Sequence, residues 1–296
     1  MFLYHLFLEP LIAFGFMKRA LVACLALSLG CGPIGIFLVL RRMSLMGDAM
    51  SHAILPGAAI GFVLAGYSLW AMSAGGLAVG LAVVILAGLV SRSTILKEDA
   101  SLAGFYLISL AAGVLMVSKK GSNVDLLHVL FGTILAVDGP SLYLVAGISS
   151  VTLIVLAIIY RPLIAECYDP GFLRTAGGGG SIYHIIFLIL VVLNLVAGFQ
   201  ALGTLMAVGL MMLPAAAARL WSNEVTGLVA IASGIAFASS AAGLLLSYHL
   251  NMPSGPSIVL CAGAAYAGSI IFGSKGGLLK AYLPRPHYHE EEEMRP

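Results

Sequence analysis

The stretch RRMSLMGDAMSHA, Arg41–Ala53, places a carboxylate and an imidazole between two long apolar runs. Asp48 and His52 are four residues apart, so their side chains share one face if the segment is helical. Ionisable residues inside a membrane span are costly, and they commonly mark a transport path. The pair therefore predicts a metal or proton site on a helix that enters a lipid bilayer.

The composition indicates a membrane protein. Of the 296 residues, 60% are hydrophobic and 9% are charged, whereas soluble domains carry about 25% charged residues. The net charge of +2 is too small to suggest nucleic-acid binding. The sequence contains no Walker A pattern, no His-Glu-x-x-His and no Gly-x-Ser-x-Gly. We therefore expect a transport role and no enzymatic activity of the chain alone.

Hydropathy predicts an all-α polytopic bundle of eight or nine spans, because a helix needs about 20 apolar residues to cross a bilayer. Only Gln200 and Ala201 separate the last two segments of the middle region, so we expect one of these to be broken or re-entrant. The candidate spans are Ala20–Leu40, Gly47–Gly66, Leu69–Val90, Leu102–Val117, Ser141–Tyr160, Ile182–Phe199, Leu202–Ala218, Val225–Tyr248 and Pro256–Phe272.

The basic residues predict the orientation. Most of them fall on alternate connections, which the positive-inside rule places in the cytoplasm; the Lys119-Lys120 pair is the exception. The N-terminus is then expected outside and the C-terminus in the cytoplasm. We expect an interfacial segment over residues 1–19, a transmembrane permease domain over 20–280 and a disordered cytoplasmic tail over 281–296.

Asp48 and His52 supply one oxygen and one nitrogen ligand, a set that suits Zn²⁺, Mn²⁺ or Fe²⁺. A hydrogen-bonded pair that only braces helices is the alternative interpretation. Two ligands are too few for a metal site, so a symmetric dimer with this helix on its axis would double them. Further candidates for the metal path are His128, Asp138, Asn194, Gln200 and His249.

Two cytoplasmic segments are candidate docking surfaces for a soluble partner. One is a short surface helix that Asp169 can cap and that contains Arg174. The other follows Pro214 and carries Arg219, Trp221 and Glu224. An ordinary loop remains the alternative for each.

Several motifs together resemble the permease subunits of ATP-binding-cassette importers for zinc, manganese and iron(II). The resemblance covers nearly the whole chain. Its motifs are Gly35–Gly57, Lys97–Ala100, Leu130–Val137, Leu202–Met206 with Leu213–Ala216, and Met252–Ser257.

The resemblance implies a homodimeric permease in the bacterial inner membrane. It implies cytoplasmic ATP-binding subunits and an extracytoplasmic metal-binding protein as partners, with Asp48 and His52 on the metal path. No permanently bound cofactor is expected, and the transported ion is expected to be zinc first and manganese or iron second. Similarity to vitamin B12-type importers favours Pro214–Glu224 as the main docking element. Two other classes remain open: a proton-coupled secondary metal transporter and a structural membrane protein.

Overall fold

The computed structural model describes residues 14–66, 68–119, 137–168 and 180–279, and this part of the chain is helical without a strand. Its nine helices are α2 (Gly15–Leu40), α3 (Met46–Ala65), α4 (Leu69–Ser93), α5 (Glu98–Lys119), α7 (Gly139–Tyr168), α9 (Gly180–Leu202), α10 (Thr204–Ala218), α11 (Val225–Leu250) and α12 (Ser254–Phe272).

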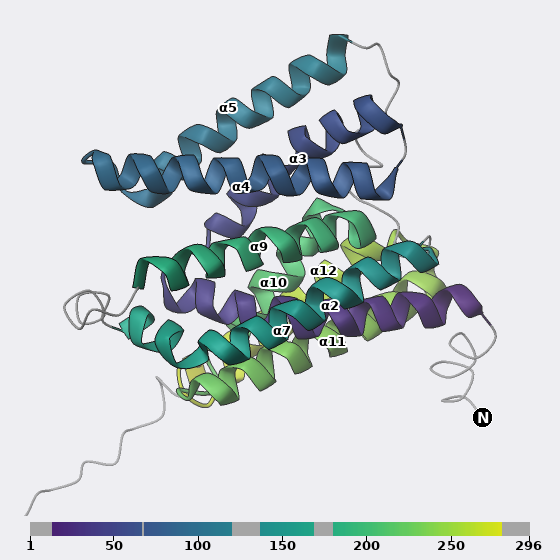
Figure 1. Ribbon diagram of the computed structural model, residues 1–296. Coiled ribbons are helices and arrows are strands. Elements are labelled where there is room, and N and C mark those ends of the chain that lie inside the picture. Colours follow the sequence, from purple (N-terminus) through teal and green to yellow (C-terminus); the bar gives the residue numbers. More distant parts are fainter. Residues whose placement is uncertain (1–13, 67, 120–136, 169–179, 280–296) are drawn as a thin grey trace, which may run out of the picture.

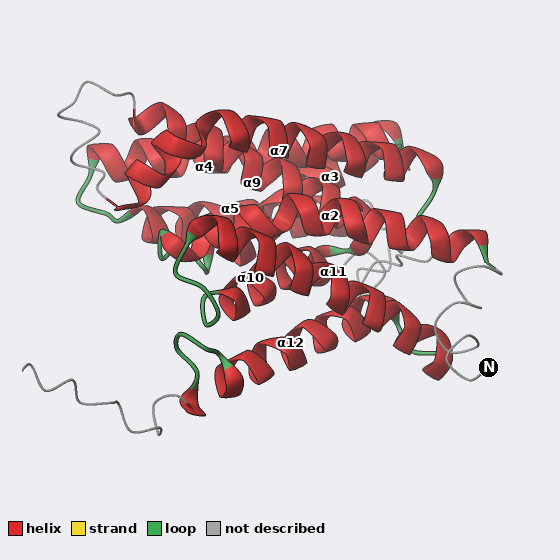
Figure 2. Cartoon of the chain, turned by 90° about the horizontal axis from the view of Figure 1, so that it is seen from below, coloured by secondary structure: helices red, strands yellow, loops and turns green. Residues whose placement is uncertain are grey.

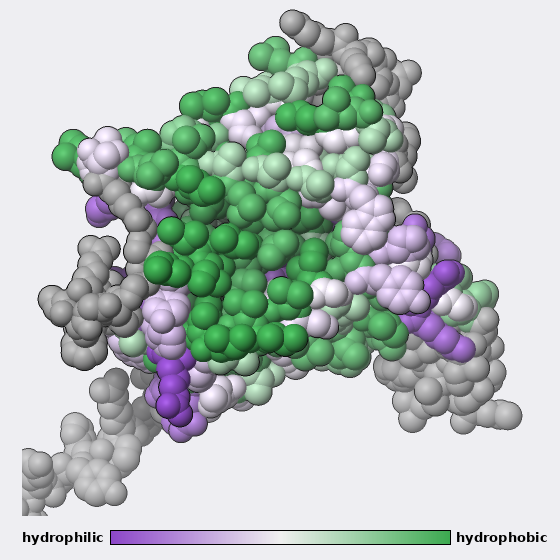
Figure 3. Space-filling model, in the orientation of Figure 1, coloured by the Kyte–Doolittle hydropathy of each residue, from purple (hydrophilic) through white to green (hydrophobic). Residues whose placement is uncertain are grey.

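The all-α membrane fold is confirmed. Eight of the helices in the described ranges are long and apolar enough to cross a membrane. The other, α10, has 15 residues and is about 22 Å long, which is shorter than an apolar core of about 30 Å. Figure 3 shows an apolar band across the middle of the visible face, with hydrophilic residues gathered toward the ends of the helices.

Two boundaries differ from the sequence expectation. The first helix begins at Gly15, five residues before the span expected from Ala20. The expected interruption at Gln200 and Ala201 is wrong by two residues, because α9 continues to Leu202 and the break falls at Gly203. Gly203 has φ of +85°, a conformation that only glycine adopts without a steric penalty.

The described helices form two groups, which lie apart in Figure 1 and overlap in the view from below in Figure 2. The three-helix group consists of α3, α4 and α5, which pack chiefly on one another. The six-helix group consists of α2, α7, α9, α10, α11 and α12, with α2 and α9 as the most enclosed spans. The two groups meet where α4 contacts α9 and where α3 contacts α9 and α10.

Small residues allow α3 and α4 to pack backbone to backbone. A Cβ added at Gly57 would collide with the carbonyl of Gly75, and one added at Gly61 would collide with the carbonyl of Ala71. Such close approach is a main source of helix association in lipid, where burial of apolar surface contributes little. The glycines therefore fix the position of α3 within its group.

The turn from α2 into α3 is set by backbone hydrogen bonds. Arg42 has a left-handed φ of 59°, its N–H donates to the carbonyl of Val39, and the N–H of Met43 donates to the carbonyl of Leu38. This pair of bonds is a Schellman motif. It ends α2 and leaves Arg41 as the C-terminal cap, at what we call the Arg41 end of the bundle.

Asp138 caps the other end of the bundle, at the start of α7. Its Oδ1 accepts from the backbone N–H of Ser141 at 2.9 Å, as expected of an N-cap aspartate. Hydrogen bonds from the side chain and the backbone of Ser141 hold the pKa of Asp138 below its usual range. The ionised carboxylate therefore contributes to the stability of this helix start.

Replacing Gly57 with alanine should destabilise the bundle by about 1–3 kcal/mol, because the new methyl group forces α3 away from α4. A fall in the thermal unfolding midpoint of the purified protein would measure this. Gly88→Ala on α4 is the matched control, since nothing lies within 4 Å of its added Cβ. Equal midpoints for both variants would contradict the close-packing argument.

Asp138→Ala should destabilise the start of α7 by about 1 kcal/mol or less, because the cap is exposed, whereas Asp138→Asn keeps an acceptor and should cost less. Faster hydrogen exchange at the amides of residues 140–142 would report the loss. Since the pKa of Asp138 is lowered in the folded state, its contribution is present above the ordinary value of 3.8 and is lost as the pH falls below that value. If the difference in amide exchange rate between wild type and Asp138→Ala grew as the pH fell, this assignment would be contradicted.

Candidate functional site

Asp48 and His52 lie on the first two turns of α3, on one face as their spacing predicts. The Asp48 Oδ1 and His52 Nε2 atoms are 3.8 Å apart, which is too far for a hydrogen bond between them. The carboxylate sits at the helix N-terminus, where the helix dipole favours negative charge. The two potential ligand atoms are therefore close together without a hydrogen bond between them.

The pair opens onto a cavity of about 390 Å³ between the two helix groups. Asp48, Ser51 and His52 line its α3 side. The opposite wall is mostly aliphatic and comes from α10 and α12, with Thr204, Leu205, Val208, Gly209, Met212, Leu213 and Val259.

Both side chains of the pair are accessible, although α3 is a candidate membrane span. The Asp48 side chain is 66% exposed and the His52 side chain 36% exposed. The His52 ring stacks on Tyr106 of α5, with centroids 6.4 Å apart and an interplanar angle of 28°. An accessible carboxylate and an oriented imidazole can bind a divalent transition metal through oxygen and nitrogen.

One described chain does not complete a metal site. Among the residues that the structure places, no three His, Cys, Asp or Glu side chains gather closely enough to hold an ion. Divalent transition metals commonly take four or more ligands. A metal ion held by Asp48 and His52 would therefore need further ligands beyond the described side chains.

The four other metal-path candidates that the structure describes do not line this cavity. Asn194 is fully buried and donates to Thr152 Oγ1 at 2.7 Å and to the carbonyl of Leu190 at 2.8 Å, so it joins α9 to α7. Asp138 caps α7. His249 is exposed near the end of α11, with its ring on Tyr248. Gln200 lies near the end of α9, and His128 falls outside the described residues.

The candidate docking residues divide in the same way. Arg219, Trp221 and Glu224 are exposed in the connection from α10 to α11, which we call the elbow. Pro214 is buried inside α10, so its side chain is not available to a soluble partner. Asp169 and Arg174 lie outside the described residues.

The elbow is held against the end of α12 by three hydrogen bonds. The Trp221 indole N–H donates to Ser269 Oγ at 2.9 Å, and the Ser274 hydroxyl donates to the Trp221 carbonyl at 3.2 Å. The backbone N–H of Lys275 donates to the carbonyl of Leu220 at 2.9 Å. The exposed side chains of the elbow are therefore presented from a fixed backbone.

Sequence reasoning missed the partners that surround the pair. Tyr106 and the α10 wall carry no polar signal that distinguishes them from other apolar span residues. His184 did carry one, since it is an ionisable residue at the start of an apolar segment. Its contact with Glu98 spans 86 residues of sequence, which spacing rules for a single helix do not reach.

Comparison with known proteins agrees with this architecture. The model of the ABC 3 transport family matches residues 13–273. The chain is 34% identical over 269 residues to the manganese import system permease protein ScaB of Streptococcus parasanguinis, covering 91% of this chain and 95% of the relative. It is 32% identical to the manganese transport system membrane protein MntC of Halalkalibacterium halodurans, covering 93% and 94%.

A solved structure has the same fold over almost the same length. PsaBC from Streptococcus pneumoniae, in complex with Fab, superimposes with a TM-score of 0.81 at 31% sequence identity, covering 92% of this chain and 97% of that chain. Sequence, family model and fold therefore agree over the whole helical region. The chain belongs to the ABC 3 transport family of membrane permeases.

Proposed function

We propose that this chain is the permease subunit of an ATP-driven importer that carries a divalent transition metal past Asp48 and His52. The observation that carries the proposal is the accessible Asp48–His52 pair, facing a cavity between two helix groups of a membrane bundle. Neither side chain serves as a buried brace, since the two are 3.8 Å apart and partly exposed. The metal would rest on these donors as cargo and then leave toward the cytoplasm.

We place manganese first among the metals. Zinc is the first expectation from the sequence, but ScaB and MntC are both named as manganese proteins. A carboxylate is a hard ligand that suits Mn²⁺, although an N/O site binds Zn²⁺ more tightly by intrinsic affinity. Selectivity for manganese would therefore come from the number and spacing of the ligands.

A second copy of the chain would complete the donor set. A lipid-facing carboxylate is unfavourable, yet Asp48 is largely exposed in the isolated chain. The three-helix group also carries exposed apolar residues on α5, the least enclosed span. A homodimer would cover these surfaces and contribute another carboxylate and another imidazole.

ATP-binding subunits would dock at the Arg41 end, which the positive-inside rule predicts to be cytoplasmic. The elbow is the best candidate among the described residues, because its backbone is fixed while Arg219, Trp221 and Glu224 remain exposed. An extracytoplasmic metal-binding protein would deliver the ion at the opposite end.

Asp48→Asn and His52→Ala should each lower manganese uptake at least about tenfold in vesicles that contain the assembled importer, because each removes a ligand. Asp99→Asn is the matched control, since this carboxylate is exposed on α5 and does not line the cavity. Competition by zinc and iron(II) in the same assay ranks the metals.

Normal uptake in both cavity variants would remove the pair from the path. Uptake that followed a proton gradient and needed no ATP would favour the secondary transporter. A complex with no metal uptake at all would overturn the proposed function.

Arg219→Glu should weaken retention of the ATP-binding subunit on the immobilised permease at least about tenfold, because a reversed charge at an interface is repelled. Arg161→Glu is the control, since Arg161 is an exposed arginine on α7 outside the elbow. Equal retention by the two variants would move the docking surface away from the elbow.

A further inference from the structure

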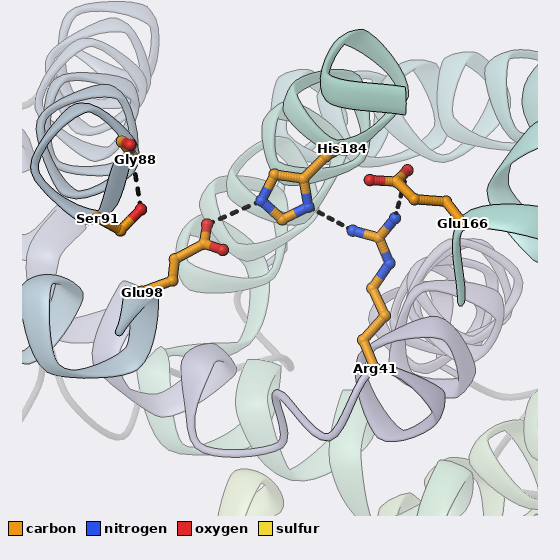
Figure 4. Close-up of polar contacts among 6 residues, drawn as sticks. All are labelled: Arg41, Gly88, Ser91, Glu98, Glu166 and His184. Carbon is orange, nitrogen blue, oxygen red and sulfur yellow. Dashed lines mark hydrogen bonds and ion pairs between the residues drawn. The ribbon is translucent and has the colours of Figure 1, made fainter. Parts of the chain in front are cut away.

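Four ionisable side chains meet at the Arg41 end, away from the cavity (Figure 4). Arg41 caps α2, Glu98 begins α5, Glu166 lies on the last turn of α7, and His184 lies on the first turns of α9. The side chains of Arg41 and Glu166 are 8% and 12% exposed, and those of His184 and Glu98 are 16% and 28% exposed. Charges enclosed to this extent are destabilising unless they are paired.

Two hydrogen bonds run in one donor-to-acceptor direction, from Arg41 through His184 to Glu98, and we call this chain the relay. Arg41 Nη1 donates to His184 Nδ1 at 2.5 Å, so Nδ1 is an acceptor and the proton of the neutral ring is on Nε2. That Nε2–H then donates to Glu98 Oε1 at 2.8 Å. The neutral imidazole is the form that can accept from Arg41 and donate to Glu98 at once.

Arg41 is anchored on the six-helix group. Its Nη2 forms an ion pair with Glu166 Oε2 at 2.7 Å, and its guanidinium lies over the Phe187 ring, 4.9 Å from the centroid. Both contacts favour one fixed position for the guanidinium. Arg41 and His184 therefore form the stationary part of the relay.

Glu98 belongs to the other group. The helix packing of α5 is chiefly against α3 and α4, so the Glu98–His184 hydrogen bond joins the three-helix group to the six-helix group. The metal-path cavity also lies between these groups, with α3 on one side and α10 and α12 on the other. To open the cavity toward the Arg41 end, the two helix groups must move apart there. The Glu98–His184 hydrogen bond connects the groups at this end, so it must break when they part.

The relay also adjoins the segments that lead into the Asp48–His52 pair. Asp48 follows Arg41 by seven residues, and Tyr106, which stacks on His52, follows Glu98 by eight residues. On a helix, eight residues span about 12 Å. A change at Glu98 would therefore be transmitted along α5 to Tyr106, which stacks on His52, through about two helical turns.

We propose that the Arg41–His184–Glu98 relay is a latch that closes the Arg41 end between the two helix groups and opens once in each transport cycle. This inference rests on the proposed function. Hydrogen bonds suit such a role because water replaces both partners when they part. A permanent brace between the groups would hold the exit shut.

A locked latch tests the proposal directly. Glu98→Cys and His184→Cys are combined in a chain whose four native cysteines are replaced, and a short reducible bis-methanethiosulfonate reagent links the new pair. The cross-linked complex should lose metal uptake and ATP turnover at least about tenfold, because the closed conformation cannot be left. Reduction of the linker should return both rates to those of the double-cysteine variant before cross-linking.

The matched control links Ser93→Cys on α4 to Asp99→Cys on α5, two exposed positions within the three-helix group. This cross-link should leave ATP turnover unchanged. A complex that turned over ATP equally fast with the 98–184 linker intact and with it reduced would overturn the latch. If the wild-type complex imported no metal, the proposed function would instead be overturned. The latch would still be tested by comparing ATP turnover with the linker intact and with the linker reduced.

Point variants separate a latch from a brace. His184→Gln can accept from Arg41 and donate to Glu98, whereas His184→Ala can do neither. The alanine variant should hydrolyse several-fold more ATP for each metal ion imported, and the glutamine variant should stay near the wild-type ratio. An unchanged ratio in the alanine variant, with only a lower yield of folded protein, would show a structural brace.

Discussion

A charged or polar group inside an apolar bundle is stable only if it is paired or in contact with water, and this constraint organises the molecule. At the Arg41 end, enclosed charges are paired across helices. In the cavity, Asp48 and His52 remain accessible, with 3.8 Å between the Asp48 Oδ1 and His52 Nε2 atoms. The same physical cost thus gives an enclosed, paired cluster at one place and a solvent-accessible pair at another, both at the boundary between the two helix groups.

Packing decides where that boundary lies. Backbone contact at Gly57 and Gly61 fixes α3 to α4, so α3 follows the three-helix group and not the α10 wall that it faces across the cavity. Because lipid gives little drive for helix association, close-packed glycine contacts are stronger determinants of grouping than apolar area. The cavity therefore lies between two separately packed groups of helices.

Much of the fold follows from sequence because hydropathy and helical spacing are local. Span lengths and the shared face of Asp48 and His52 need only neighbouring residues. The break at Gly203 was misplaced because it depends on one backbone angle, which an averaged apolar signal does not record. The contacts of His184 with Glu98 and Arg41 cross 86 and 143 residues, so they needed the three-dimensional arrangement, as did the α10 wall.

The aliphatic wall opposite the pair has a kinetic consequence. Thr204 apart, α10 and α12 present carbon and thioether surface to the cavity, with Val208, Met212 and Val259 among the lining residues. Such a surface would offer a dehydrated cation few other ligands, because aliphatic side chains do not coordinate metal ions. Conduction requires sites that hold an ion weakly enough to release it. A surface without ligands opposite a small ligand set would favour release of a transported ion over its retention.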